Sequence, residues 1–213
     1  FYSPITNKRA DAYAGNSIEG RTRLHCRVIK AVRDAVGPDY LVALRLGACD
    51  YAEGGATRED AVEACKIFER AGVDLIDVSG GICGYRGNGS KEEGYFGEDS
   101  AAIREAVDVP VIVTGGVRTA AGAERILEQG QADLVGVGRA VLKDSLWAKN
   151  AVKALGGTGV AGTVFFDFDG TLHDSMAIYG PAFRKAYAWL VSEGYMPERE
   201  FTDVWISQWL GWT

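Results

Sequence analysis

Val109-Pro-Val-Ile-Val-Thr-Gly-Gly116 is a short apolar run that ends in two glycines. The pattern returns at Ala132-Asp-Leu-Val-Gly-Val-Gly-Arg139, where the apolar run ends in Gly138 and Arg139. Runs rich in Val, Leu and Ile without polar alternation are typical of strands covered on both faces. Glycines after such strands let backbone N–H groups approach a phosphate, and arginine binds a phosphate bidentately. The two runs predict parallel strands with a phosphate site at their ends, although a glycine pair alone is more often a turn.

The strand–helix unit repeats over residues 39–155. Strands are expected at 40–45, 73–78, 109–113 and 132–137, and helices at about 58–71, 100–106, 120–130 and from 139 through 155. An earlier helix is expected over 21–36, ended by Gly37-Pro38. This alternation implies right-handed βαβ units in a parallel sheet, with the functional loops at the carboxyl ends of the strands. The predicted fold class is α/β, and four such units are half of an eight-unit barrel.

Composition narrows the classes of function. The chain has 213 residues, 47% of them hydrophobic, with a net charge of −6, which argues against a nucleic-acid surface. No apolar run approaches the roughly 20 residues that span a bilayer, and no basic start precedes an apolar segment. The four cysteines form no CxxC pair, so we expect reduced thiols in a cytoplasmic protein rather than a metal site.

The first residues carry a specific motif. The opening Ser3-Pro-Ile-Thr-Asn-Lys-Arg-Ala-Asp-Ala-Tyr-Ala-Gly-Asn-Ser-Ile-Glu-Gly-Arg21 resembles the old yellow enzyme family of FMN-dependent NAD(P)H:flavin oxidoreductases, whose pattern is SPxTNxRxDxYGGxxxENR. Ala14 replaces a glycine of that pattern and Gly20 an asparagine, so we expect a weakened cap and a less firmly held opening loop. The resemblance extends to about Leu155 and implies the C-terminal half of a (β/α)8 TIM barrel over residues 1–155. Because Phe1 opens the chain without a methionine, we expect it to be part of a longer sequence.

The resemblance also implies a cofactor site. Arg45 matches the arginine that faces the flavin pyrimidine edge, where a permanent cation stabilises charge on reduced flavin. The phosphate site matches Gly115, Gly116, Gly138 and Arg139. FMN is the implied cofactor, NADH or NADPH the reductant, and an enone or enoate the substrate.

The remaining parts of that family's site are not expected in this chain. Its catalytic donors precede the position of Phe1, so the chain is predicted to keep at most affinity for the FMN phosphate and to be inactive alone. His25 falls within a predicted helix and is no substitute. The long loop over 80–97 is expected either to shape substrate entry or to be a mobile glycine-rich segment.

A second motif follows a glycine-rich linker over 156–162. Asp167-Phe-Asp-Gly-Thr-Leu172, after an apolar strand at 163–166, resembles the first motif of haloacid-dehalogenase-like (HAD-like) hydrolases. That resemblance implies a fragment over 163–213 in which Asp167 is the nucleophile and Asp169 the general acid/base, both serving as Mg²⁺ ligands.

Three hypotheses of function stand after the sequence. The first is an FMN-dependent enoate-reductase-like oxidoreductase by descent. The second is an incomplete Mg²⁺-dependent HAD-like phosphatase. The third is a non-catalytic half-barrel that pairs with a second half-barrel or with its own copy, because half-barrels have open edges and one uncovered apolar face.

Overall fold

The computed structural model describes residues 1–82, 89–156, 188 and 191–192. The chain divides into two compact units, Phe1–Val160 and Ala161–Thr213, and the fold below is that of the first. The predicted linker beyond Gly156, the strand at 163–166 and the motif with Asp167 and Asp169 lie outside the described residues. The HAD-like hypothesis therefore stays a prediction.

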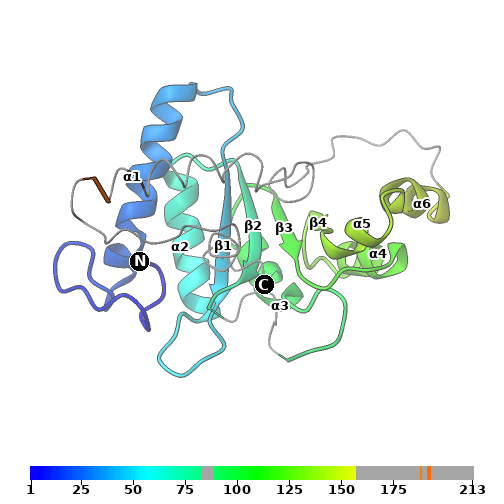
Figure 1. The fold of residues 1–213 in the computed structure, drawn as a ribbon, viewed down its shortest axis with the longest axis horizontal. Coiled ribbons are helices and arrows are strands. Elements are labelled where there is room, and N and C mark those ends of the chain that lie inside the picture. Colours follow the sequence, from blue (N-terminus) through cyan, green and yellow to red (C-terminus); the bar gives the residue numbers. More distant parts are fainter. Residues whose placement is uncertain (83–88, 157–187, 189–190, 193–213) are drawn as a thin grey trace. The chain divides into compact units, whose positions relative to one another are not determined.

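Four parallel strands form one sheet in the order β1-β2-β3-β4, side by side in Figure 1. They are β1 (Ala43–Cys49), β2 (Leu75–Gly80), β3 (Val111–Thr114) and β4 (Leu134–Gly136). Each strand begins later than predicted, because aspartate side chains accept backbone N–H groups at the strand starts. Asp74 accepts the N–H of Val42 (2.8 Å), and Asp133 accepts that of Val111 (2.9 Å). The α/β class and the parallel sheet are confirmed.

One helix precedes β1, one follows each of the first three strands, and two follow β4 (Figure 1). They are α1 (Ile18–Val36), α2 (Arg58–Arg70), α3 (Gly97–Arg104), α4 (Ala120–Glu128), α5 (Arg139–Lys143) and α6 (Trp147–Ala154). Side-chain caps start three of them: Ser17 for α1, Thr57 with Asp60 in a capping box for α2, and Thr119 for α4. The predicted single helix through 155 is wrong, because extended backbone at Asp144 separates α5 from α6.

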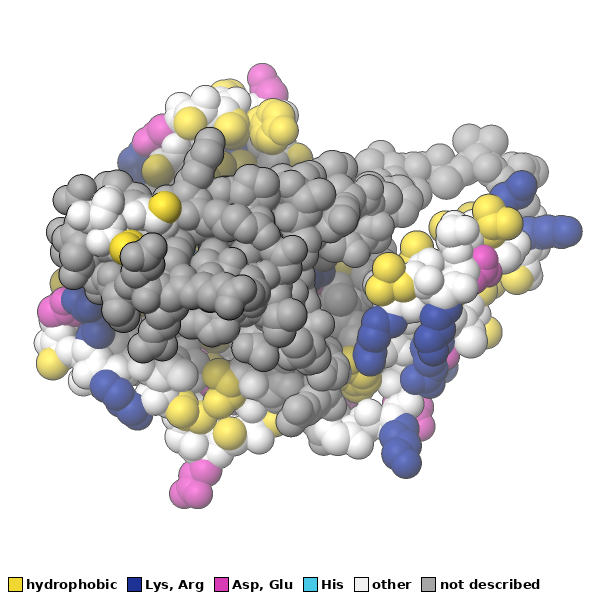
Figure 2. All heavy atoms as spheres, viewed as in Figure 1, with side chains coloured by type: hydrophobic (Ala, Val, Ile, Leu, Met, Phe, Trp, Pro, Cys, Tyr) yellow, Lys and Arg dark blue, Asp and Glu magenta, His cyan; other side chains and the backbone are white. Residues whose placement is uncertain are grey.

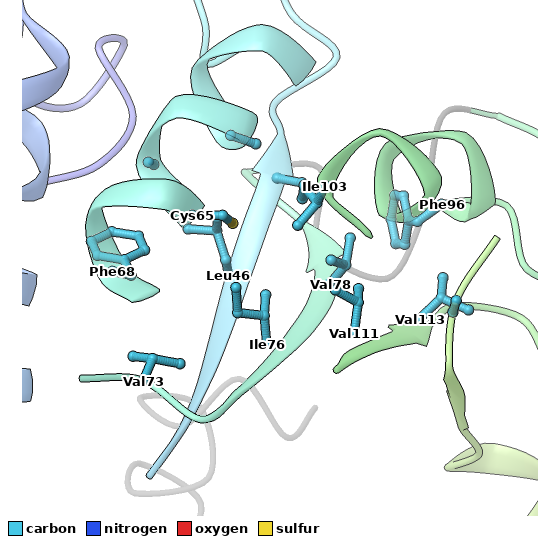
Figure 3. Packing of buried hydrophobic residues seen from close by; sticks show 14 of the residues in the cluster. Leu46, Cys65, Phe68, Val73, Ile76, Val78, Phe96, Ile103, Val111 and Val113 are labelled. Carbon is cyan, nitrogen blue, oxygen red and sulfur yellow. The ribbon is translucent and has the colours of Figure 1, made fainter. Parts of the chain in front are cut away.

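Three of the described helices, α2, α3 and α4, pack on the same face of the sheet. Alternate residues of the strands, such as Leu46, Val78 and Val113, point into a core shared with α2, α3 and α4 (Figure 3). Residues between them, such as Arg45 and Asp77, lie on the other face. On this second face, which we call the open face, the charged pair lies next to the apolar pair of Ala43 and Leu75, and Leu75 is 5% exposed. The expectation that the strands are covered on both faces therefore stays a prediction.

The opening loop is held firmly, contrary to the expectation from Gly20. Residue 20 lies in the first turn of α1, and the Ser17 hydroxyl accepts its N–H (3.1 Å), so the cap is intact. A Cβ at position 20 would lie 2.3 Å from the carbonyl oxygen of Ala14. Residues 14 and 20, the two positions that differ from the family pattern, are therefore close together. The Asn7 amide donates to the carbonyls of Phe1 (2.7 Å) and Tyr13 (2.9 Å).

A buried carboxylate ties this loop to the sheet. Asp50, 2% exposed after β1, accepts the hydroxyl of Ser3 (2.6 Å) and the backbone N–H groups of Ala56 (2.7 Å) and Ile82 (2.9 Å). Three separate segments thus meet on one side chain at the carboxyl edge of the sheet. That edge is the one where the candidate site lies.

Candidate functional site

A pocket of about 700 Å³ lies at the carboxyl ends of the strands. All the sequence-predicted cofactor residues line it: Arg45 from β1, Gly115 and Gly116 after β3, Gly138 after β4, and Arg139 at the start of α5. The parallel sheet brings these residues together, since it places every strand's carboxyl end on the same edge. What they bind is not tested by this geometry and stays a prediction.

A polar row crosses the open face of the sheet, and its two ends, Arg45 and Thr114, line the pocket. Arg45 pairs with Asp77, with Nη2 and Nε at 2.6 and 2.7 Å from Oδ2, and the Thr114 hydroxyl donates to Oδ1 (2.7 Å). The side chain of Arg45 is 54% exposed and that of Asp77 15%. The carboxylate is therefore held from both sides while the guanidinium reaches solvent. Sequence reasoning identified Arg45 but not its partner.

The glycine pair lies under an aromatic cluster. A Cβ on Gly115 would lie 2.8 Å from ring carbons of both Tyr95 and Phe96, and one on Gly116 would lie 2.5 Å from the Tyr95 ring. Gly116 also has a φ of 69°, the left-handed region that favours glycine. The two rings pack edge to face with centroids 4.7 Å apart. Packing alone therefore requires both glycines, whatever ligand approaches their other side.

The second half of the predicted phosphate site, Gly138 and Arg139, is open. A Cβ on Gly138 would meet nothing within 4 Å, and its φ of −105° suits any residue. Arg139 begins α5, and its Nη2 lies 3.5 Å from the Tyr95 hydroxyl. The pocket is also lined by Arg118, Lys143 and Asp144. Cations therefore predominate in this part of the lining, and Figure 2 shows Lys and Arg side chains gathered over the part of the chain that holds α4–α6.

The loop that carries the aromatic cluster is anchored to α4. The Glu93 carboxylate accepts the backbone N–H groups of Arg118 and Thr119 and the Thr119 hydroxyl, each at 3.2 Å. The indole N–H of Trp147 donates to the Arg118 carbonyl (2.7 Å). The described ends of the loop, 80–82 and 89–97, thus contribute a fixed wall of the pocket. Tyr85, in the middle of this loop, lies outside the described residues.

Tyr51 supports the same wall from β1. It has a φ of 50°, its ring stacks on Phe96 with centroids 6.1 Å apart, and its hydroxyl donates to the buried Asp99. Asp99 also accepts Nε of Arg58 (2.8 Å). Burial, and then the hydrogen bond to Asp99, raise the pKa of the Tyr51 phenol. Tyr51 is therefore protonated near neutral pH and positions Phe96. No local sequence signal marks this cluster, because its members come from three separate segments.

Other candidate groups lie away from the pocket. His25 is in α1, as predicted, tilted against Phe68 with ring centroids 5.5 Å apart, and burial lowers its pKa. Cys26, Cys49 and Cys65 are not in disulfides. Within the described ranges, no cluster of His, Cys, Asp or Glu is arranged to hold a metal ion. In the same ranges, no helix has the length and apolar character needed to cross a membrane.

Comparison with known proteins places this geometry in a family. The model of the NADH:flavin oxidoreductase / NADH oxidase family matches residues 1–156. The NADH oxidase of Thermoanaerobacter brockii is 38% identical over 157 residues, covering 71% of this chain and 24% of that protein. The NADPH dehydrogenase of Bacillus licheniformis is 38% identical over 168 residues, covering 78% of this chain and 48% of that protein. The chain therefore spans about half or less of the length of these relatives.

A solved structure agrees with the sequence matches. The 2-naphthoyl-CoA reductase complex with 2-naphthoyl-CoA superposes with a TM-score of 0.63 at 26% identity, over 73% of this chain and 24% of that one.

Proposed function

The chain belongs to the NADH:flavin oxidoreductase / NADH oxidase family, and from that premise we propose that its pocket binds FMN. The observation that carries the proposal is the convergence of Arg45, Gly115, Gly116, Gly138 and Arg139 on one pocket. In this proposal the phosphate lies against Gly138 and Arg139, and the pyrimidine edge of the flavin faces Arg45.

The described residues fit an anionic ligand. The Gly138 position has room where a Cβ would otherwise stand, and Arg139 and Lys143 outnumber Asp144 in the lining nearby, while Arg118 is paired with Glu93. A phosphate that accepts from a guanidinium and from backbone N–H groups is well matched to such a lining. When bound, FMN would supply hydride transfer, and this chain's residues would hold its phosphate and balance charge at its ring.

The activity proposed for the whole protein is oxidation of NADH or NADPH with reduction of an activated alkene, an enone or enoate. The relatives' names support the nicotinamide part of this proposal, whereas the alkene comes from the resemblance alone. That the 213-residue chain is inactive alone, and that it is cytoplasmic, stay predictions. Steady-state NADH oxidation by the FMN-loaded chain measures the first of these.

The test of binding is FMN titration followed by flavin fluorescence. Arg139→Gln is expected to weaken FMN binding by about 10- to 100-fold, since a hydrogen-bonded charged partner contributes about 1.5–3 kcal/mol. Lys149→Gln is the matched control, because Lys149 is exposed on α6 and outside the pocket lining. Gly138→Ala should weaken FMN binding without lowering thermal stability. Absence of saturable binding by the wild-type chain, or equal affinities of all the variants, would refute the proposal.

Self-association is a second candidate, favoured by two open edges. Within the described sheet β1 pairs only with β2, and β4 pairs only with β3. The outer side of α1 also exposes Val28, Val32 and Val36, by 54, 40 and 40%. Exposed parallel edges favour pairing with another chain. Sedimentation velocity tests this: a dimer unaffected by FMN supports a non-catalytic half-barrel, and a monomer at all concentrations contradicts it.

A further inference from the structure

The carboxylate of Asp77 lies beside the one cation that the proposed function places at the flavin ring. Asp77 and Arg45 are register partners on β2 and β1, and their side chains meet on the open face at 2.6 Å. Thr114 on β3 donates to the other carboxylate oxygen. A carboxylate with two such partners, 15% exposed, is fixed in place and stays close to the guanidinium.

This pairing changes what Arg45 does electrostatically. An isolated guanidinium favours the reduced flavin, which carries an additional negative charge on its ring at mildly alkaline pH. A guanidinium paired with a carboxylate is instead a dipole whose field falls off faster with distance. Because the Asp77 side chain is only 15% exposed, its charge is not fully screened by solvent.

We propose that Asp77 sets how strongly the pocket prefers reduced over oxidised FMN, by offsetting the charge of Arg45. The inference rests on the proposed function, since it needs FMN beside Arg45. Asp77 acts through charge and without touching the reacting atoms. It thereby keeps the preference for reduced FMN lower than Arg45 alone would make it.

The measured quantity is the ratio of the dissociation constants of oxidised and reduced FMN. Fluorescence titration gives the first constant, and anaerobic titration with dithionite, which supplies two electrons per FMN while solvent supplies the proton, gives the second through the midpoint potential. Asp77→Asn should raise this ratio by about tenfold, and Arg45→Gln should lower it by a similar factor. The double variant, with both charges removed, should lie within about threefold of the wild type.

Asp133→Asn is the matched charge control. Asp133 also pairs with an arginine, Arg104, at 2.7 Å. It directly precedes β4, so it lies at the amino ends of the strands, whereas the pocket lies at their carboxyl ends. Its replacement should leave the ratio within about twofold of the wild type, because distant exposed charges are screened. If Asp77→Asn alone does not fold, the double variant is compared with Arg45→Gln. Asp77→Asn should then raise the ratio by about tenfold relative to Arg45→Gln.

The outcomes separate this inference from the proposed function. If the wild-type chain does not bind FMN, both are refuted. If FMN binds and Asp77→Asn lowers the ratio as Arg45→Gln does, Asp77 merely holds Arg45 in position and the inference alone is refuted. An unchanged ratio in Asp77→Asn refutes it as well.

Discussion

Replacing Gly116 with alanine tests whether packing requires the glycine pair independently of any ligand. At a φ of 69° an alanine costs about 1–2 kcal/mol relative to glycine. Its Cβ would also lie 2.5 Å from the Tyr95 ring, and such overpacking typically costs about 1–3 kcal/mol. Together these predict a loss of ~2–5 kcal/mol, or roughly 4–20 °C in the midpoint of thermal unfolding for a domain of this size.

The assay is thermal unfolding followed by circular dichroism, without FMN. The control is the same replacement in a Tyr95→Ala background, where only the backbone cost remains. The two substitutions should then couple by about 1–3 kcal/mol. Equal costs in both backgrounds would show that the Tyr95 ring does not press on residue 116. An unchanged midpoint in Gly116→Ala alone would refute the backbone argument too.

Three further predictions concern stability and reactivity. Asp50→Ala leaves two buried donors and the part-buried Ile82 N–H without their acceptor and should cost about 3 kcal/mol in urea unfolding. A cost below that of replacing an exposed aspartate such as Asp34 would contradict the network. Burial raises the pKa of Cys65 to about 12, so iodoacetamide should label it only after unfolding; mass spectrometry of the native protein checks this. Hydrogen bonds from the Val42 N–H and then from Arg33 hold the pKa of Asp74 below its ordinary value. The stability that Asp74 adds is thus present above its unfolded pKa and is lost as pH falls through its folded pKa, so Asp74→Asn should flatten the loss of stability below pH about 4.

The sheet was predictable because its signal is local. Apolar runs such as Val109–Val113 fit strands, and caps such as Thr57 fit helix starts, so each element appears within a few residues of its predicted place. The strand starts were missed because they depend on aspartates that accept backbone N–H groups across strands, as Asp133 does for Val111. The break at Asp144 was missed because the helical pattern continues through it.

The site was predictable only in part. The family pattern identifies Arg45, which lies within β1, and the glycines that follow β3 and β4. It does not identify Asp77 or Glu93, whose roles depend on which segments meet in space. The long loop that carries Tyr95 and Phe96 was predicted, but Tyr51, which stacks on Phe96, was missed because the two residues are distant in sequence.

The core and the site share one register, which makes their geometries interdependent. Leu46 pairs with Val78 in the buried layer, and the preceding pair on the same two strands is Arg45 with Asp77. A slip of β1 by one residue relative to β2 would turn Leu46 out of the core and Arg45 into it, while Val78 and Asp77 kept their faces. The energy that buries Leu46 and Val78 therefore also fixes the ion pair on the open face. For this reason we expect the charge arrangement at the pocket to persist in any variant that keeps this core, and charge substitutions there to report electrostatics rather than a shift of the strands.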